Sequence, residues 1–179
     1  MRNATAAFAF GHELGIDYDA AATGVAAFRG VGRRFTLRGE HNDITFVDEY
    51  AHLPGEVRAA LAAAKAGNWN RIVCVFQPHR YSRTAQVGHE FEGAFDDADL
   101  LVLNGVYAAG EPPRPGVDGH VIRRAVEAGV GHPPITYVEE RSALVAAVAD
   151  ILVPGDLCIT VGAGDITKLS DELLTLLRG

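Results

Sequence analysis

Hydrophobic positions recur along this chain with two periods, one typical of helices and one typical of strands. From residue 44 onward, short runs of consecutive apolar residues alternate with segments whose apolar residues fall three or four positions apart. Continuous apolar runs of this length are typical of strands that are buried on both faces of a sheet. The alternation therefore predicts an α/β fold, with a mostly parallel, doubly wound (Rossmann-like) sheet and helices on both faces.

The two kinds of segment give ranges for the expected elements. We expect a hairpin with a turn at 39–42 and strands at 34–38 and 44–47, followed by strands at 71–76, 99–104, 135–138 and 157–161. We expect helices at 54–66, 85–95, 119–128, 140–150 and 166–177. The helix at 54–66 begins with Pro54, a residue favoured in the first helical turn. Beyond the first strand of the hairpin, five strands thus alternate with helices, as in a parallel sheet.

The first thirty residues follow a different pattern. Ala-rich helical segments at 3–14 and 18–28 flank the short break from Gly15 to Asp17, and Gly30 and Gly32 interrupt the pattern again. Because the helical pattern is already under way at the first residues, we expect residues 1–30 to be the C-terminal remnant of an upstream domain. Residues 31–179 are expected to form the main domain.

Composition narrows the classes of protein. With 179 residues, 48% of them hydrophobic, the chain can bury one good core, and its net charge of −7 argues against non-specific nucleic-acid binding. No apolar stretch reaches the length of a membrane span, and no signal peptide is visible. Cys74 and Cys158 each lie within an apolar run, so we expect reduced core residues of a cytoplasmic protein. The alternative is a disulfide between them.

Polar and charged residues that could bind a ligand or take part in catalysis are concentrated just after the predicted strands. The polar segments 48–52, 77–80, 104–111 and 162–165 each follow a predicted strand, and ligands bind at the carboxyl edge of open α/β sheets. The densest segment, from Phe76 to Thr84, carries two guanidinium groups, an imidazole, a phenol and two hydroxyls. Arginine forks suit carboxylate and phosphate oxygens, so this loop is typical of a site for an anionic, phosphorylated substrate. The alternative is a solvated polar loop.

The glycine turn from Gly162 to Asp165 is compatible with two interpretations. It is not a P-loop, because Thr167 stands where that motif requires a glycine before Lys168. Its backbone N–H groups could hold an anion such as a carboxylate near a helix N-terminus, or its glycines could serve only a tight turn. The sequence also has no HExxH or CxxC pattern, and its histidines are dispersed, so no metal site is predicted. Of the histidines, His52 and His79 fall at predicted strand ends.

Four segments together resemble the C-terminal domain of the Mur ligase family. In chain order they are Val47–Arg58, Phe76–Thr84, Val106–Glu111 and Gly162–Ile166. The segment at 76–84 resembles the branch of the family that joins L-alanine to UDP-N-acetylmuramate. Residues 3–7 resemble the end of a nucleotide-binding motif of the family, so that the resemblance covers essentially the whole chain.

The resemblance implies one part of a three-domain enzyme of peptidoglycan synthesis. An N-terminal domain would bind the UDP-sugar, a central domain would bind ATP and Mg²⁺, and this domain would bind the incoming amino acid. In such a ligase, ATP phosphorylates the muramoyl carboxylate and the amine of L-alanine attacks the acyl phosphate. ATP and Mg²⁺ would be held mainly by the domains that this chain lacks, so the chain is not expected to catalyse alone.

The resemblance also implies roles for individual residues. Asn3 would contact adenine, Arg34 the terminal phosphate and Asp48 the ribose hydroxyls, while Tyr50 would lie beside the nucleotide. The residues near the reacting groups would be His52, His79, Arg80 and Arg83. The incoming amino acid would contact Gly162, Ala163, Gly164 and Asp165.

One departure from the family pattern concerns the amino-acid side. The family usually has a second histidine where this chain has Leu53, so this chain has no imidazole at that position near the amino-acid side. The alternative class is a stand-alone binding or regulatory module that keeps the fold without ligation. The presence of Arg34, Asp48, His79, Arg80 and Arg83 favours the enzyme, because a non-catalytic module has no need of this set.

Overall fold

The computed structural model describes residues 2–28 and 32–179, apart from the side chains of Arg2 and Asn3. It divides into two compact units, residues 1–32 and 33–179, and each is described by itself below. The predicted domain boundary between residues 30 and 31 lies outside the described residues.

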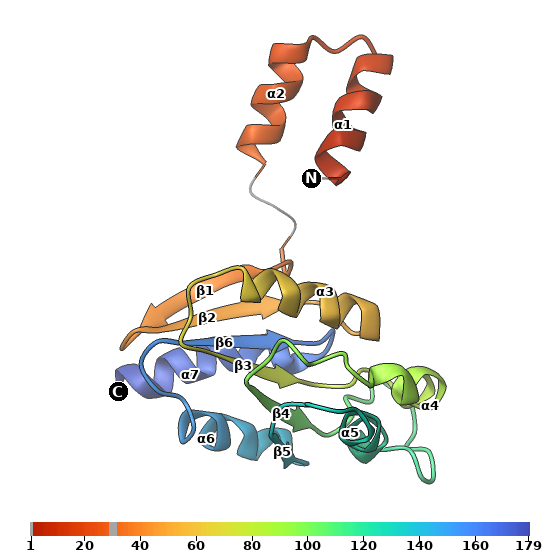
Figure 1. Ribbon diagram of the computed structural model, residues 1–179, viewed down its shortest axis with the longest axis vertical. Helices are drawn as coiled ribbons and strands as arrows, with labels where there is room; N and C mark the ends of the chain where they lie inside the picture. The colour runs from red at the N-terminus through yellow and green to blue at the C-terminus, as the bar shows by residue number, and fades with distance from the viewer. Residues whose placement is uncertain (1, 29–31) are drawn as a thin grey trace. The chain divides into compact units, whose positions relative to one another are not determined.

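The described part of the larger unit is built on a six-stranded sheet with the order β1-β2-β6-β3-β4-β5 (Figure 1). The strands are β1 (Thr36–His41), β2 (Ile44–Glu49), β3 (Arg71–Phe76), β4 (Leu100–Asn104), β5 (Ile135–Val138) and β6 (Asp156–Val161). β1 pairs antiparallel with β2, and every other neighbouring pair in this sheet is parallel. The predicted mostly parallel sheet is therefore confirmed.

Helices cover both faces of this sheet. One hydrophobic cluster joins one sheet face to α3 (Pro54–Lys65), the 3₁₀ turn η1 (Gly88–Phe91) and α5 (Gly119–Ala128), with α4 (Tyr81–Val87) at its border. A second cluster joins the other face to α6 (Leu144–Ala149) and α7 (Leu169–Arg178). The two clusters confirm the predicted doubly wound arrangement, in which the inner strands β2, β6, β3 and β4 are buried on both sides.

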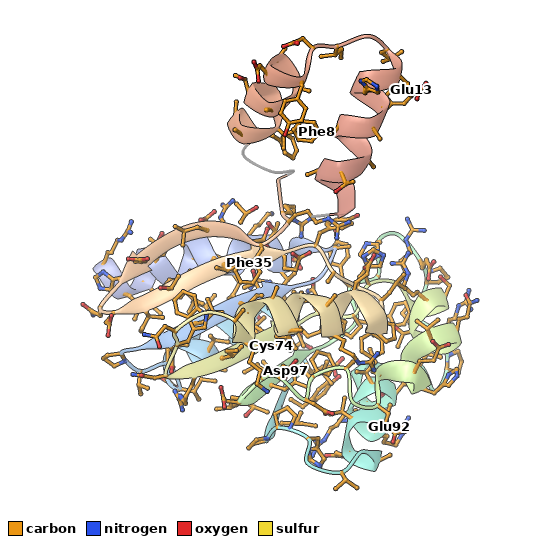
Figure 2. All side chains as sticks on the ribbon, turned by 45° about the horizontal axis from the view of Figure 1, so that its top comes forward. Phe8, Glu13, Phe35, Cys74, Glu92 and Asp97 are labelled. Atoms are coloured by element: carbon orange, nitrogen blue, oxygen red, sulfur yellow. The ribbon has the colours of Figure 1, made fainter. Side chains whose placement is uncertain are left out.

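The first cluster is centred on aromatic rings and on one of the two cysteines. The rings of Phe76, Phe91 and Phe95 lie 5.2–5.8 Å apart, a favourable range for aromatic packing. Cys74, labelled in Figure 2, and Cys158 on the other sheet face are both free and fully buried. Burial raises the pKa of both thiols, that of Cys158 to about 12. They are core residues, as predicted, and no disulfide joins them.

The hairpin differs from its prediction in both strand and turn. β1 runs on through Gly39 to His41, with a bulge between Leu37 and Gly39, so the turn predicted at 39–42 is wrong. The chain reverses instead at Asn42 and Asp43, whose φ values of 50° and 60° match the two left-handed positions of a type I′ turn. Gly39 lies at a bulge within the strand and not in the turn. The turn is formed by Asn42 and Asp43, since Asn and Asp tolerate positive φ best after glycine.

The helix predicted at 85–95 is also wrong at both ends. α4 begins at Tyr81 because the carbonyl of Arg80 accepts hydrogen bonds from both the N–H (3.0 Å) and the hydroxyl (2.9 Å) of Thr84. The helix gives way to η1 at Gly88, and Gly93, with φ at 65°, is incompatible with a helix that continues to 95. Two other predicted helices begin with separate 3₁₀ turns, η2 (Arg141–Ala143) and η3 (Asp165–Lys168).

The smaller unit is a helical pair with little core. α1 (Arg2–Glu13) and α2 (Tyr18–Ala27) contact each other through the rings of Phe8 and Tyr18, 5.5 Å apart. Asp17 caps α2 by accepting a hydrogen bond from the N–H of Asp19 at 3.0 Å. No described residue of α2 is buried, and Phe10 is 68% exposed. No helix in the described ranges is both long and apolar enough to cross a membrane.

We expect the two units to differ in amide hydrogen exchange. Local opening is cheap where few apolar contacts are broken, so the amides of α1 and α2 should exchange orders of magnitude faster than those of β3, whose residues from Ile72 to Phe76 are buried. Exchange of the isolated chain, followed by mass spectrometry at neutral pH, measures this directly. Equal protection in residues 4–27 and 72–76 would contradict the expectation.

Candidate active site

The loops that follow four strands are tied together at the carboxyl edge of the sheet. The N–H of Gly162, after β6, donates to the carbonyl of Glu49 at 3.0 Å, and the N–H of Gln77, after β3, donates to the carbonyl of Val161 at 3.0 Å. The loop after β3 is joined in the same way to Tyr107 in the loop after β4. The ladder of the sheet thus continues past the strand ends and holds the predicted site segments side by side.

The loop from Gln77 to Thr84 has a constrained backbone. Arg80 has a φ of 74°, which an arginine adopts only where the surroundings enforce it. The enforcing contacts come from Tyr107, which accepts the N–H of Arg80 at 2.8 Å, and from Glu111, which accepts the N–H and hydroxyl of Ser82 at 2.8 and 2.5 Å. These bonds from Ser82 lower the pKa of Glu111. Arg80 is held in this strained conformation with its side chain exposed.

His79 lies between a cation and an aromatic ring. Its Nδ1 is 3.1 Å from Nη1 of Arg83, and its ring stacks on that of Tyr107 at 5.7 Å. Burial, then the charges of Arg83 and Arg80, lower the pKa of His79, so the imidazole is neutral at pH 7. His52, His79 and Arg83 lie together around one small pocket of about 10 Å³, which the buried rings of Phe76 and Phe91 also line.

His52 is held at the start of α3. Its Nδ1 lies 3.1 Å from the carbonyl oxygen of Tyr50 and 3.5 Å from Oε2 of Glu56. The same Oε2 accepts the backbone N–H groups of His52 and Leu53, at 3.0 and 3.3 Å, and so caps the helix in place of the missing N-cap side chain. Glu56 was not predicted as a site residue. Its position three residues after the N-cap, where a glutamate commonly caps a helix, is the sequence feature from which this role could have been predicted.

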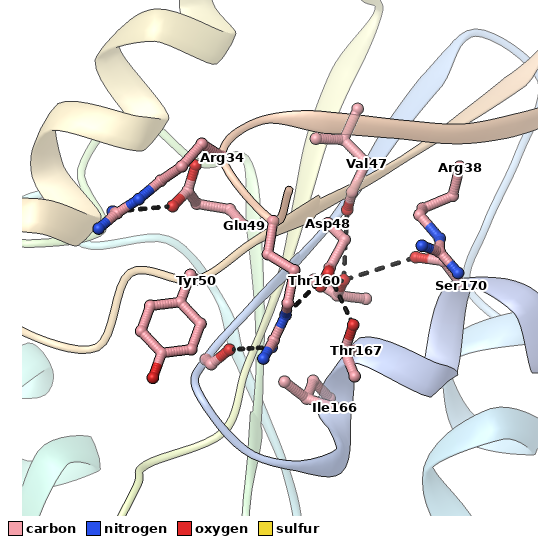
Figure 3. A network of polar contacts seen from close by, with 12 residues as sticks. Arg34, Arg38, Val47, Asp48, Glu49, Tyr50, Thr160, Ile166, Thr167 and Ser170 are labelled. Atoms are coloured by element: carbon pink, nitrogen blue, oxygen red, sulfur yellow. Dashed lines mark hydrogen bonds and ion pairs between the residues drawn. The ribbon is translucent and has the colours of Figure 1, made fainter. Parts of the chain in front are cut away.

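A fully buried carboxylate, that of Asp48, joins four segments of the chain (Figure 3). Its Oδ1 accepts from the hydroxyl of Thr160 at 3.0 Å, and its Oδ2 accepts from the hydroxyl of Thr167 at 2.7 Å. Oδ2 also accepts from Nε of Arg33 at 3.2 Å, while Nη2 of Arg33 donates to the carbonyl of Gly162 at 2.7 Å. Arg33, Thr160 and Thr167 had no local pattern that marked them.

In this structure Asp48 is engaged inside the domain, and its expected contact with the ribose hydroxyls stays a prediction. Its side chain has no exposed surface and both oxygens are engaged within the domain, so a ribose hydroxyl has no access to it in this structure. The neighbouring Arg34 is 52% exposed at its side chain and lies 3.6 Å from Oε1 of Glu49. Its guanidinium carbon is 5.8 Å from the ring centroid of Tyr50, which Arg33 also approaches at 4.8 Å. Arg34 and Tyr50 remain accessible candidates for an anionic ligand.

The glycine turn after β6 has a steric reason for its glycines. A Cβ on Gly162 would lie 2.8 Å from the carbonyl oxygen of Gln77, and a Cβ on Gly164 would lie 2.5 Å from its side-chain oxygen. Nε2 of Gln77 in turn donates to Asp165 at 2.8 Å and to Asn104 at 3.0 Å. These contacts account for the glycines of the turn without a ligand, as the tight-turn alternative expects, and they fix Gly162, Ala163, Gly164 and Asp165 beside the loop after β3.

The remaining predicted features are placed as follows. Asn3 lies in α1, and its side chain is outside the described residues. Beside Tyr107, a hollow of about 490 Å³ is lined by polar groups that include Asn104, Arg141 and Asp165. Within the described ranges, no three histidine, cysteine, aspartate or glutamate side chains gather in a way that could hold a metal ion.

Known proteins share both the sequence and the fold. A model of the family described as "Mur ligase, glutamate ligase domain" matches residues 33–164. The chain is 47% identical over 176 residues to the UDP-N-acetylmuramate–L-alanine ligase of Myxococcus xanthus, covering 98% of this chain and 37% of the relative. It is 46% identical over 176 residues to the ligase of the same name from Anaeromyxobacter dehalogenans, covering 98% of this chain and 38% of the relative.

Solved structures agree with this assignment. The crystal structure of UDP-N-acetylmuramate–alanine ligase from Thermotoga maritima matches with a TM-score of 0.76 and 29% identity, over 98% of this chain and 37% of that one. A murein peptide ligase from Psychrobacter arcticus has the same fold, with a TM-score of 0.73 and 22% identity over 98% of this chain and 36% of that one. The chain spans little more than a third of the length of the relatives it matches. It belongs to the Mur ligase family, through the glutamate ligase domain.

Proposed function

We propose that this chain is the C-terminal portion of an ATP-dependent ligase that joins L-alanine to UDP-N-acetylmuramate in peptidoglycan biosynthesis. The observation that carries the proposal is the convergence of His52, His79 and Arg83 on one pocket at the carboxyl edge of the sheet. The ligases named for this reaction match nearly the whole chain over a part of their own length. The upstream part of such a ligase would supply the remaining domains.

In this proposal the arginines act on anionic groups. A guanidinium presents several N–H donors in a planar fork, and one nitrogen of Arg83 is oriented by its contact with His79. Arg80 and Arg83 would hold the carboxylate of the amino acid or the phosphate of the activated substrate, and would stabilise the negative charge of the tetrahedral intermediate. The turn from Gly162 to Asp165 would border the amino acid.

The nucleotide would meet this domain at the start of β1 and the end of β2. The exposed guanidinium of Arg34 suits a phosphate, and Tyr50 would lie beside the nucleotide, while Asp48 acts from inside through Arg33. The donor set of the described residues does not suit Mg²⁺, because no cluster of carboxylates faces one point. We therefore place Mg²⁺, and the phosphate loop for ATP, in the upstream domains.

The helical pair would be the end of the central domain. Its exposed apolar residues, Phe10, Leu14, Tyr18 and Phe28, are what a helix pair shows when the sheet it covers is absent. A cytoplasmic location agrees with the reduced, buried state of Cys74 and Cys158 and with the need for ATP and a UDP-sugar. The alternative, a stand-alone binding module, predicts that no upstream ATP-binding domain takes part.

Activity can be tested in a hybrid ligase, in which this chain replaces the matched C-terminal part of the Myxococcus xanthus relative. In this hybrid ligase, Arg80→Ala and Arg83→Ala should each lower turnover by about 10²–10³-fold, because a charge-stabilising contact is lost. Lysine at either position should restore only part of the rate, since it keeps the charge without the fork. Phosphate release that depends on L-alanine is the measurement.

The matched control is Arg124→Ala, which removes an exposed arginine of α5 that does not line the pocket. It should leave turnover and thermal stability unchanged, as most surface substitutions do. Near-normal turnover in both Arg80→Ala and Arg83→Ala would remove the arginines from the mechanism. A wild-type hybrid that is folded yet inactive with L-alanine would count against the proposed function itself.

The isolated chain should bind ATP only weakly. Its candidate contacts to the nucleotide, from Arg34 and Tyr50, include no loop of backbone N–H groups around the phosphates, and that loop dominates affinity in P-loop ATPases. Isothermal titration calorimetry should give a dissociation constant well above 1 μM, which corresponds to less than about 8 kcal/mol of binding free energy. A sub-micromolar constant would show that the chain carries a complete nucleotide site.

A further inference from the structure

Nδ1 of His52 and Nδ1 of His79 have opposite kinds of hydrogen-bond partner, an acceptor for His52 and a donor for His79. The two rings therefore carry their protons on different nitrogens. Their ring centroids lie 6.4 Å apart, so both face the same small space. In a neutral imidazole, one nitrogen carries a proton and the other carries a lone pair. The partner of each Nδ1 therefore determines what the Nε2 of the same ring can do.

His79 has its lone pair on Nδ1. The partner of Nδ1 is Nη1 of Arg83, at 3.1 Å, and a guanidinium donates hydrogen bonds but accepts none. The neutral ring must then carry its proton on Nε2. Burial and the charges of Arg83 and Arg80 lower the pKa of this ring and keep it neutral. His79 can donate a hydrogen bond into the pocket, but it has no free lone pair with which to accept a proton.

His52 has the reverse arrangement. Its Nδ1 lies 3.1 Å from the carbonyl oxygen of Tyr50 and 3.5 Å from Oε2 of Glu56, and both oxygens are acceptors. Nδ1 must therefore carry the proton, and the neutral ring has its lone pair on Nε2. The carboxylate of Glu56 also stabilises the imidazolium that forms when Nε2 accepts a proton. The arrangement of carboxylate, imidazole and free Nε2 is the usual one for a histidine base.

We propose that His52 accepts the proton that the ammonium of the incoming amino acid must lose before it attacks, that Glu56 is the residue that positions His52, and that His79 serves as a hydrogen-bond donor. This inference rests on the proposed function, since the attack on an acyl phosphate is part of it. It goes beyond that function by giving the two histidines separate roles.

The step balances as follows. Nε2 of His52 takes one proton from the ammonium, and the nitrogen lone pair of the resulting amine attacks the carbonyl carbon of the acyl phosphate. The C–N bond forms, and the C–O bond to phosphate breaks with its electron pair on the departing phosphate. The second proton leaves the nitrogen and is carried away by the phosphate as HPO₄²⁻. The proton on His52 then passes to water, which regenerates the base.

The charged and titratable neighbours of His52 come from α3, from α4 and from the loops after β2, β3 and β4. Glu56 lies on α3, Tyr50 precedes it with its ring 5.4 Å away, and His79 lies across the pocket with Arg80 and Arg83 beyond. Glu111 contacts the start of α4. Of these groups, Glu56 is the carboxylate that the structure places against the imidazole of His52, so its removal tests the positioning role directly.

The first test separates the proton transfer from the formation of the acyl phosphate. Hydroxylamine is largely uncharged at pH 7 and traps an acyl phosphate without a base. In the hybrid ligase, His52→Gln should lower the rate with L-alanine by about 10²-fold or more, the usual contribution of a general base. It should leave the UDP-N-acetylmuramate-dependent formation of hydroxamate within about threefold of wild type. His89→Gln, at an exposed position, is the control.

The second test uses the pH profile, which a purely structural role would not move. Glutamine at position 56 can still cap α3 through its side-chain oxygen, but it removes the negative charge beside Nδ1. With the negative charge beside Nδ1 removed, the imidazolium formed during proton transfer loses its counter-charge, so the acid limb of kcat/KM for L-alanine should move to lower pH. Turnover at the plateau should also fall. Glu90→Gln, which makes the same change at an exposed position, is the control and should leave the acid limb in place. His79→Gln should also leave the acid limb in place.

Each outcome decides one question. Equal loss of both activities in His52→Gln, or an unmoved acid limb in Glu56→Gln, would overturn the assignment of the base and its positioning residue. A shift of the acid limb in His79→Gln would show that the roles of the two histidines are reversed. A wild-type hybrid that forms no hydroxamate with ATP and UDP-N-acetylmuramate would instead show that the proposed function is wrong.

Discussion

The site depends on one buried charge, the carboxylate of Asp48. A carboxylate without contact with water is costly unless hydrogen bonds or an opposite charge compensate it. Here Arg33, Thr160 and Thr167 provide both, and they come from the segment before β1, from β6 and from η3. Since removing any partner would leave Asp48 under-compensated, these segments are held in one arrangement relative to the end of β2.

The chemistry of the edge follows from that arrangement. β2 ends at Glu49, one residue after Asp48, and the chain continues into Tyr50 and His52. Arg33 binds the carbonyl of Gly162 and lies over the ring of Tyr50. Backbone hydrogen bonds between neighbouring loops also fix the positions of the loops after β3 and β4, where His79 stacks on Tyr107. The side chains proposed to act on the substrate are thus oriented by a scaffold of buried contacts, as rapid chemistry requires.

The sequence predicted those features that have a local signature. Apolar runs located the strands, and the parallel topology then gathered the strand-end loops at one edge, which brought His52, His79 and Arg83 together as expected. The sequence did not predict that Asp48 joins distant segments or that Glu56 lies against His52. Both roles depend on contact partners that the hydrophobic pattern does not show. Thr160 and Thr167 are more than a hundred positions from Asp48, and the loop before α4 is held by the distant Tyr107 and Glu111.

The most direct test of this account is a double-mutant cycle between Arg33 and Asp48, measured as the free energy of unfolding of this chain in urea. If the pair organises the edge, Asp48→Asn and Arg33→Gln should each destabilise the α/β unit. The double variant should be destabilised by less than the sum, with a coupling free energy of roughly 1–3 kcal/mol. Additive effects, with no coupling beyond the error of the measurement, would contradict the claim that this interaction holds the site together.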